Sequence, residues 1–205
     1  MRIFRRSFSL LELIFVIVIV AIISSQIIPK STISKLNLAV DKIILNLNYT
    51  RYIAHIDNKY DIEDDQWKKK LWTLKFQRCS SSVGGLYYVI YSDESGGTAH
   101  FKKSETLKDP LSLKYLYSTS SCINSYDTSK YILLTKEYGV TKVEVSCNTT
   151  DAIGQISFGY DGRIYSQLGS NPKEILNRCE IKLYDITGDF RTITIEPKTG
   201  YIGEK

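Results

Sequence analysis

The sequence has few residues suited to catalysis. Its only histidines are His55 and His100, and it contains no HExxH metal motif, no GxSxG nucleophile motif and no phosphate-binding P-loop. His55 falls where a helix is expected to end and His100 falls in an expected loop, where a histidine is usually a solvated polar residue. We therefore expect no catalytic residue, no cofactor and no enzymatic activity.

Closely spaced cysteines are also absent. The four cysteines are Cys79, Cys122, Cys147 and Cys179, and none forms a CxxC pair, which argues against a zinc site. Widely spaced, even-numbered cysteines favour two disulfides in an oxidising compartment, with four buried free thiols as the alternative. Three pairings are possible. We favour Cys79 with Cys122 and Cys147 with Cys179, because each bond joins neighbours in sequence.

The chain has no strong excess of charge of one sign. Its formal net charge of +5 comes from 27 Lys and Arg against 22 Asp and Glu. Arg2, Arg5 and Arg6 supply three of the positive charges, so the remainder carries 24 against 22, a net charge of +2. Such a small excess gives little support for nucleic acid as a general partner.

One long hydrophobic run interrupts this mixed composition. Residues 8–28 read FSLLELIFVIVIVAIISSQII and contain a single charged residue, Glu12. As a helix this run would span about 31 Å, close to the thickness of a bilayer core. A charge inside a membrane costs about 2.5–3.5 kcal/mol near the helix centre, so Glu12 indicates a function and needs a cationic partner.

The short basic head before this run, residues 1–7, predicts a cytoplasmic N-terminus with the rest of the chain outside. Residues 24–30 lack an A-x-A cleavage site, which argues against an ordinary secretory signal peptide. The same absence argues against a twin-arginine signal, although Arg5-Arg6-Ser7-Phe8 is similar to one. A plain single-span anchor is the simplest alternative, but it does not explain the carboxylate.

The helical pattern continues beyond Pro29, which can kink the helix, and residues 29–60 form an amphipathic half with two apolar stripes. One stripe has alternating spacings of three and four: Ile33, Leu36, Val40, Ile43, Leu47, Thr50 and Ala54. The other recurs every seven residues, about 160–200° around the helix: Leu38, Leu45 and Tyr52. We expect the first stripe to pack on the chain's own domain and the second to contact a different chain. A helix buried on both sides in one core is the alternative.

We expect this helix to end near residues 55–60, where an acidic group begins. Its members are Asp57, Asp61, Glu63, Asp64 and Asp65. Clustered carboxylates can bind Ca²⁺, but the EF-hand spacing and its glycine are absent, so a solvated loop is the favoured interpretation.

From Trp67 onward the hydrophobic period changes to two, which is typical of strands. Strands are predicted at residues 72–77, 86–91, 111–117, 131–135, 140–146, 154–158, 163–166, 181–184 and 190–195. Asp161-Gly162 is a hairpin signal, residues 197–200 form the last turn, and residues 93–130 are expected to be mostly loop. The prediction is an α+β fold with one long helix packed on an antiparallel β domain at residues 61–205.

The N-terminal residues carry a family resemblance. SFSLLELIFVIVIVAII resembles the segment of type IV pilins and type II secretion pseudopilins that is cleaved and methylated. Those proteins have a short basic leader, a cut just before Phe, and Glu as the fifth residue of the mature chain. Here the cut would fall between Ser7 and Phe8, with Glu12 fifth and Pro29 where such proteins often have proline. The family normally has glycine before the cut, but serine is also small, and we expect processing.

A second resemblance lies near the C-terminus. GQISFGYDGRIYS and FRTITIEPKTGYI resemble paired strands of H-type minor pseudopilins, the GspH/FimT family, and Trp72-Thr73-Leu74 resembles the first strand of that family. The likeness covers residues 1–55, 67–91 and 153–203. Residues 92–152 resemble nothing in it.

The resemblance implies a pilin-like fold and a structural role in a minor pseudopilin that supports protein secretion or DNA uptake. A prepilin peptidase would remove residues 1–7 and methylate the Phe8 amine, and Glu12 would pair with the Phe8 ammonium of a neighbouring subunit. The implied partners are other pilins or pseudopilins and an inner-membrane assembly platform, in a hetero-oligomeric filament. The implied location is the bacterial inner membrane, single-pass, with a cytoplasmic N-terminus and a periplasmic β domain.

A DNA-binding minor pilin for natural transformation is the main alternative. The residues that favour it are aromatic and basic: Trp67, Lys68, Lys69, Lys70 and Trp72. However, residues 155–205 contain seven Lys or Arg against seven Asp or Glu, so this stretch has no basic footprint. The ending GYIGEK also lacks the arginines that DNA-binding relatives have near the last strand. A solvated loop is the favoured interpretation of the three lysines. A third interpretation is a plain membrane-anchored β domain with an uncut N-terminus.

Overall fold

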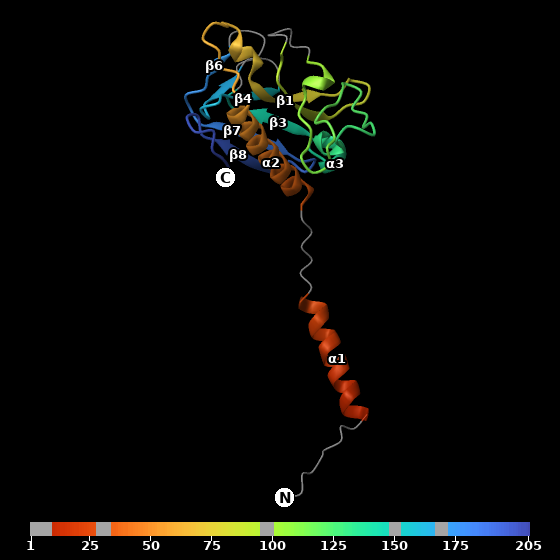
Figure 1. Cartoon of the computed structure of the whole chain (residues 1–205). Helices are drawn as coiled ribbons and strands as arrows, with labels where there is room; N and C mark the ends of the chain where they lie inside the picture. The colour runs from red at the N-terminus through yellow and green to blue at the C-terminus, as the bar shows by residue number, and fades with distance from the viewer. Residues whose placement is uncertain (1–9, 28–33, 95–100, 148–152, 167–171) are drawn as a thin grey trace, which may run out of the picture. The chain divides into compact units, whose positions relative to one another are not determined.

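The computed structural model describes residues 10–27, 34–94, 101–147, 153–166 and 172–205 (Figure 1). The chain divides into two units, residues 1–33 and residues 34–205. The first unit contains one described helix, α1 (Leu10–Ile27). The second contains helix α2 (Lys35–Ile56) and every strand among the described residues, so α2 belongs to the globular unit.

Helix α2 begins and ends at polar residues. The Oγ of Ser34 accepts a hydrogen bond from the backbone N–H of Leu36 at 3.3 Å, which satisfies one of the free donors of the first turn. At the other end the N–H of Asp57 donates to the carbonyl of Ile53 at 2.8 Å, and the helix stops. The predicted end near residues 55–60 is confirmed.

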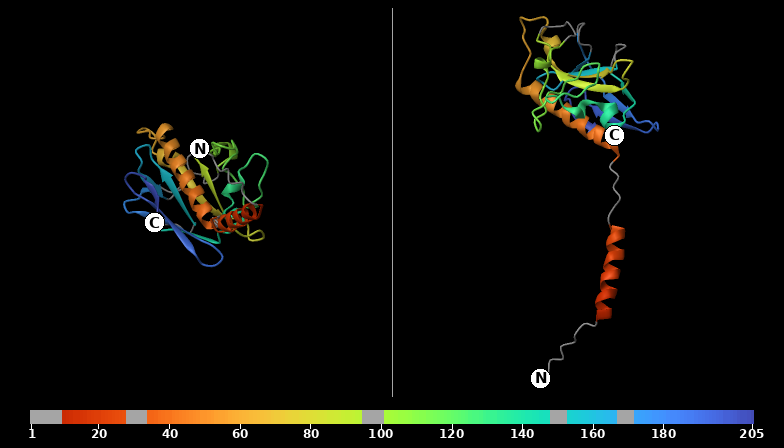
Figure 2. Two further views of the ribbon diagram at one scale, coloured as in Figure 1. Left: turned by 90° about the horizontal axis from the view of Figure 1, so that it is seen from below. Right: turned by 90° about the vertical axis from the view of Figure 1, so that its right-hand side faces the viewer.

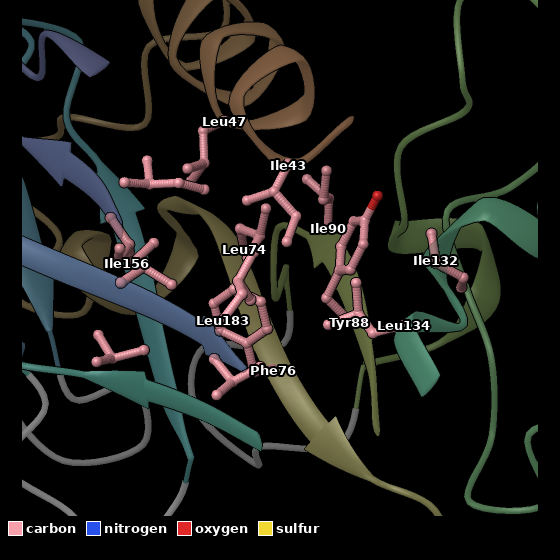
Figure 3. Close-up of a cluster of buried hydrophobic side chains, with 14 of the residues drawn as sticks. Ile43, Leu47, Leu74, Phe76, Tyr88, Ile90, Ile132, Leu134, Ile156 and Leu183 are labelled. Atoms are coloured by element: carbon pink, nitrogen blue, oxygen red, sulfur yellow. The ribbon is translucent and has the colours of Figure 1, made fainter. Parts of the chain in front are cut away.

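The first apolar stripe of α2 is the face that packs on the sheets, as predicted. Its described members are buried: Leu36, Val40, Ile43, Leu47, Thr50 and Ala54. Ile33 lies outside the described residues. Figure 3 shows Ile43 and Leu47 pointing from α2 toward Leu74 and Ile156 of the sheet beneath. One buried polar contact crosses this core, where the Asn46 amide donates to the hydroxyl of Tyr88 at 2.6 Å.

The strands form two antiparallel sheets. The five-stranded sheet has the order β2-β1-β4-β5-β6, formed by β1 (Trp72–Arg78), β2 (Leu86–Tyr91), β4 (Gly154–Phe158), β5 (Ile164–Ser166) and β6 (Lys173–Glu174). The four-stranded sheet has the order β3-β7-β8-β9, formed by β3 (Lys142–Val145), β7 (Cys179–Tyr184), β8 (Phe190–Ile195) and β9 (Ile202–Glu204). Helix α2 contacts β1 and β4 of the first sheet and β7, β8 and β9 of the second (Figure 2). A helix on antiparallel sheets is the predicted α+β class.

Two glycine turns join the sheets at one end of the unit. Gly162 (φ +83°) closes the turn between β4 and β5, and Gly200 (φ +60°) closes the turn between β8 and β9. The N–H of Ile164 donates to the carbonyl of Pro197 at 3.2 Å. A Cβ on Gly200 would lie 2.6 Å from the carbonyl oxygen of Gly162, so the two turns approach too closely for any side chain. The two C-terminal motifs noted in the sequence therefore meet in space.

Two predicted strands are wrong. Residues 131–135 form the end of a 3₁₀ turn, η3 (Lys130–Ile132), and the start of α3 (Leu134–Tyr138), which ends at Gly139 in the left-handed conformation. A short apolar run is buried in either structure, so its periodicity cannot separate strand from helix.

Residues 111–117 are part of a long segment between β2 and η3, residues 92–129, which we call the excursion. The Asp109 carboxylate accepts from the N–H groups of Leu111 and Ser112, which turns the chain where a strand was expected. Leu113 has a φ of +56°. The excursion bonds to β2 on both sides of this turn, where the N–H of Leu107 donates to the carbonyl of Ile90 at 2.9 Å and the carbonyl of Leu116 accepts from the N–H of Ile90 at 3.3 Å. The short strand β6 was not predicted.

The ion pair that ties the excursion to α2 gives a pH-dependent prediction. Lys42 Nζ lies 2.9 Å from Asp109 Oδ2, and the two side chains are 16% and 3% exposed. Burial opposes the charged form of Asp109, but the hydrogen bonds from Lys42 and from the backbone of Leu111 outweigh it and lower the pKa of this carboxyl. Because the folded pKa lies below the unfolded value of about 3.9, the stabilisation is present above that pH and is lost as the pH falls through the folded pKa.

We expect Asp109→Asn to lower the free energy of unfolding by about 3 kcal/mol at pH 7 and to reduce its loss in acid. Denaturant melts of the full chain between neutral and acidic pH measure both effects. The control is Arg178→Gln, whose partner Glu196 is 2.7 Å away in a pair that is 58% and 37% exposed. It should cost about 0.5 kcal/mol or less. The prediction is wrong if Asp109→Asn lowers the free energy of unfolding no more than Arg178→Gln does.

The contact between the two glycine turns gives a second prediction. Gly200→Ala should destabilise the chain by about 3 kcal/mol, since it adds left-handed strain and forces backbone away from backbone. Gly188→Ala is the matched control, because Gly188 has a φ of +90° but nothing within 4 Å of an added Cβ. Gly188→Ala should lower the free energy of unfolding only by the backbone strain, about 1 kcal/mol. Equal costs in urea melts would mean that the turn contact contributes nothing.

Candidate assembly surfaces

Helix α1 exposes apolar side chains around its whole circumference. From Leu10 to Ile23 these side chains are 48% to 78% exposed. Glu12 lies in the first turn, where a carboxylate meets the partial positive charge of the helix N-terminus. Ser7 and Phe8, the predicted cleavage and methylation residues, lie outside the described residues.

Within the residues that the structure describes, no helix combines the length and the apolar character needed to cross a bilayer. The predicted span, residues 8–28, extends past α1 at both ends into residues that the structure does not describe, and it stays a prediction.

The second stripe of α2 faces away from the core. Leu38, Leu45 and Tyr52 are 43%, 50% and 59% exposed, although residues one or two positions away on the same helix are fully buried. Ile56, which the seven-residue spacing did not include, extends this outer stripe at 60% exposure. A helix with one apolar face against its own sheets and one apolar seam in solvent has an unused surface suited to another chain.

The outer stripe ends at a hollow, a surface pocket with a volume of about 370 Å³. Asn48, Arg51, Tyr52 and His55 line it from α2, and the turn at residues 160–162 lines it from the sheet. The Nδ1–H of His55 donates to the carbonyl of Tyr160 at 2.8 Å, so this hydrogen bond links α2 to the turn between β4 and β5. His100 lies outside the described residues.

Two disulfides hold the globular unit, with the pairing that the sequence favoured. Cys79 is bonded to Cys122 and Cys147 to Cys179, with Cα atoms 5.7 and 5.2 Å apart. The first bond ties the β1–β2 loop to the excursion. In the chain-entropy model a cross-link over such loops stabilises the folded state by about 3–4 kcal/mol.

The excursion, residues 92–129, carries several exposed apolar side chains. It is held to the unit by the Lys42–Asp109 pair and the first disulfide, and internally by an ion pair between Lys103 and Asp127. Its exposed members are Leu111, Leu113, Ile123 and Tyr126. Apart from the short helical turn η2 (Lys103–Glu105), its described part is loop, as expected.

The predicted basic aromatic surface is only partly assembled. Lys68, Lys69 and Lys70 lie in a 3₁₀ turn, η1 (Trp67–Lys70). Lys68 Nζ lies 5.6 Å from the ring centre of Trp67, but Lys70 is paired with Asp64 at 2.6 Å. The side chain of Trp72 is directed to the acidic loop, because its Nε1–H donates to Asp57 at 2.8 Å.

The acidic loop uses several of its carboxylates locally. Asp57 also pairs with Lys59 at 2.9 Å, and Asp61 accepts from the backbone N–H of Glu63 at 2.9 Å. Within the described parts of the chain, no three His, Cys, Asp or Glu side chains gather in a way that could hold a metal ion.

The two faces of α2 give a stability prediction. Leu47→Ala removes a side chain that is 0% exposed and should lower the free energy of unfolding by about 3 kcal/mol. Leu45→Ala, two residues away and 50% exposed, should change it by about 0.5 kcal/mol or less. Urea melts of both variants measure the difference. A large loss for Leu45→Ala would show that the outer stripe is part of the chain's own core.

Comparison of the chain with family models, with curated proteins and with solved structures gave no match.

Proposed function

We propose that this chain is a structural subunit of a filament of the type II secretion or type IV pilus kind, a minor pseudopilin without enzymatic activity. One observation carries the proposal. Glu12 lies in the first turn of α1, a helix whose other side chains from Leu10 to Ile23 are all apolar. A single carboxylate at the start of such a helix is costly unless a cation meets it in the assembled state.

The cation that fits is the N-terminal amine created by cleavage between Ser7 and Phe8. An ammonium at Phe8 and a carboxylate at Glu12 are each unfavourable in lipid, and they offset one another when they belong to adjacent subunits. Because the pair forms only at one axial offset between two helices, it would set the register of the filament. Methylation by the prepilin peptidase keeps the amine cationic.

The outer stripe of α2 supports the same proposal from the globular unit. Leu38, Leu45, Tyr52 and Ile56 form an exposed apolar seam one side chain wide, with the polar residues Asp41 and Asn48 exposed in the same row. A narrow seam of this kind suits packing against another helix. In the filament this seam would contact a neighbouring pilin or pseudopilin.

The proposed location follows from the charge of the N-terminus and from the disulfides. Residues 1–7 would stay cytoplasmic until removal, and the unit with two disulfides would lie in the oxidising periplasm. The partners would be the peptidase, the inner-membrane assembly platform and the other subunits of the filament. The chain would support protein secretion or DNA uptake through this assembly.

We expect Glu12→Gln to leave membrane insertion intact and to reduce incorporation into filaments by at least about tenfold, since a neutral amide cannot neutralise the Phe8 ammonium. The amount of chain in sheared filaments, relative to the membrane fraction, measures this. Glu63→Gln is the matched control, because it is the same substitution and also removes one negative charge, but from the exposed acidic loop that follows α2. Wild-type incorporation of Glu12→Gln would rule out the proposed role of this residue.

A further inference from the structure

Four aromatic rings from distant parts of the sequence line one hollow of the globular unit. Tyr60 follows α2, Trp67 opens η1, Tyr160 lies in the β4–β5 turn and Tyr165 lies in β5. Ring centres are 5.1 Å apart for Tyr60 and Trp67, 5.7 Å for Tyr60 and Tyr160, and 6.2 Å for Trp67 and Tyr165. The hollow has a volume of about 310 Å³, within the range of small-molecule sites.

The rings are supported on one side and open on the other. Tyr165 is 5% exposed and fixes the base of the cluster, whereas Tyr60 and Tyr160 are 44% and 38% exposed. Rings that pack edge to face already have their conformations set, so a ligand that contacts them need not order them first.

Charged groups complete the hollow with both donors and acceptors. Arg163 Nε lies 3.1 Å from Asp161 Oδ2, and Arg163 Nη1 lies 3.5 Å from Glu174 Oε2. The guanidinium side chain is 52% exposed, so it presents N–H groups to solvent beside two carboxylates. Lys68 and Arg163 balance Asp161 and Glu174, and the formal charge of the lining is zero.

The equal numbers of positive and negative side chains in this lining favour an uncharged sugar over single-stranded nucleic acid. Single-stranded nucleic acid also stacks on aromatic rings, but its affinity depends on a positive groove along the phosphates, which the hollow does not supply. An uncharged sugar ring has an apolar C–H face that packs on an aromatic ring and hydroxyl groups that pair with carboxylates and guanidinium. The polar groups of the hollow, which both donate and accept, match those hydroxyl groups.

The hollow continues on the other side of Trp67. A second hollow of about 640 Å³ shares Trp67, Lys68 and Glu174 with the first and extends along Asp65, Lys69 and Lys173. The two hollows together are lined by four Lys or Arg and three Asp or Glu, a net charge of +1, so the enlarged site still has no strongly positive groove. Trp67 therefore separates two adjoining spaces, which suits a chain of sugars better than a single one.

We propose that these aromatic hollows form a binding site for a neutral oligosaccharide, with Trp67 as the central stacking platform and Arg163, Asp161 and Glu174 as its hydrogen-bonding groups. The proposal does not rest on filament assembly, because its named residues lie neither on α1 nor on the outer stripe of α2, although Tyr160 and Asp161 also line the hollow at the end of that stripe.

The test is calorimetric titration of the full chain with three neutral probes, maltohexaose, cellohexaose and fully N-acetylated chitohexaose. The chain is kept in a detergent without a sugar head group, which would otherwise compete. At least one probe should bind, and Trp67→Ala and Tyr160→Ala should each weaken that binding by about tenfold or more. Tyr126→Ala removes a tyrosine that is 90% exposed on the excursion and should leave binding unchanged.

The proposal is overturned if none of the probes binds below about 10 mM, or if both site variants bind as tightly as the wild type. It is also overturned if a thymidine oligonucleotide or a proline-rich peptide binds in a Trp67-dependent way while no saccharide does. Thermal melts accompany each titration. If Trp67→Ala is not folded, Tyr160→Ala decides by the same criterion, because its exposed ring can be removed without opening the core.

Discussion

The packing of one face of α2 against both sheets is the interaction on which the rest of the globular unit depends. Leu36, Val40, Ile43 and Leu47 are buried there, and α2 contacts strands of two separate hydrogen-bonded ladders, which the two glycine turns also join at one end. The buried hydrogen bond from Asn46 to Tyr88 fixes the rotation of α2 about its axis. Either polar group without its partner would be left unsatisfied in the core. Rotation of the helix about its axis would break this bond and expose the apolar stripe.

The burial of one face of α2 also determines which side chains the opposite face exposes to solvent. With the inner stripe buried, the outer stripe of Leu38, Leu45 and Tyr52 must point to solvent in the single chain, because the two stripes lie on nearly opposite sides of the helix. The same helix then connects the core to the surface that we propose for assembly. The excursion contacts α2 at Lys42, and the aromatic hollow borders the end of the seam, because Tyr160 and Asp161 also line the hollow beside Tyr52.

Much of the fold could be predicted from local pattern. Period-two stretches and turn glycines placed β1, β2, β4 and β8 within a residue or two, and the two stripes of α2 were separated by spacing alone. The failures have physical causes. Residues 131–135 are buried whether helical or extended, and Asp109 turns the chain through side-chain hydrogen bonds that no hydrophobic pattern encodes. The aromatic hollow was not predicted, because Tyr60, Trp67, Tyr160 and Tyr165 meet only through the tertiary fold. The sequence indicated Trp67 and Lys68 only as part of a predicted basic aromatic surface, and no pattern placed the three tyrosines beside them.

The central claim is that residues 1–7 are a leader and that the mature chain begins at Phe8, whose amine pairs with Glu12 of a neighbour. Mass spectrometry of the N-terminal peptide of the chain, isolated from the membranes of its own host, tests this most directly. The account predicts a peptide that begins with N-methylated Phe8. An N-terminal peptide that still carries Met1 would contradict it, because an uncut chain has no ammonium at the position that Glu12 is proposed to meet.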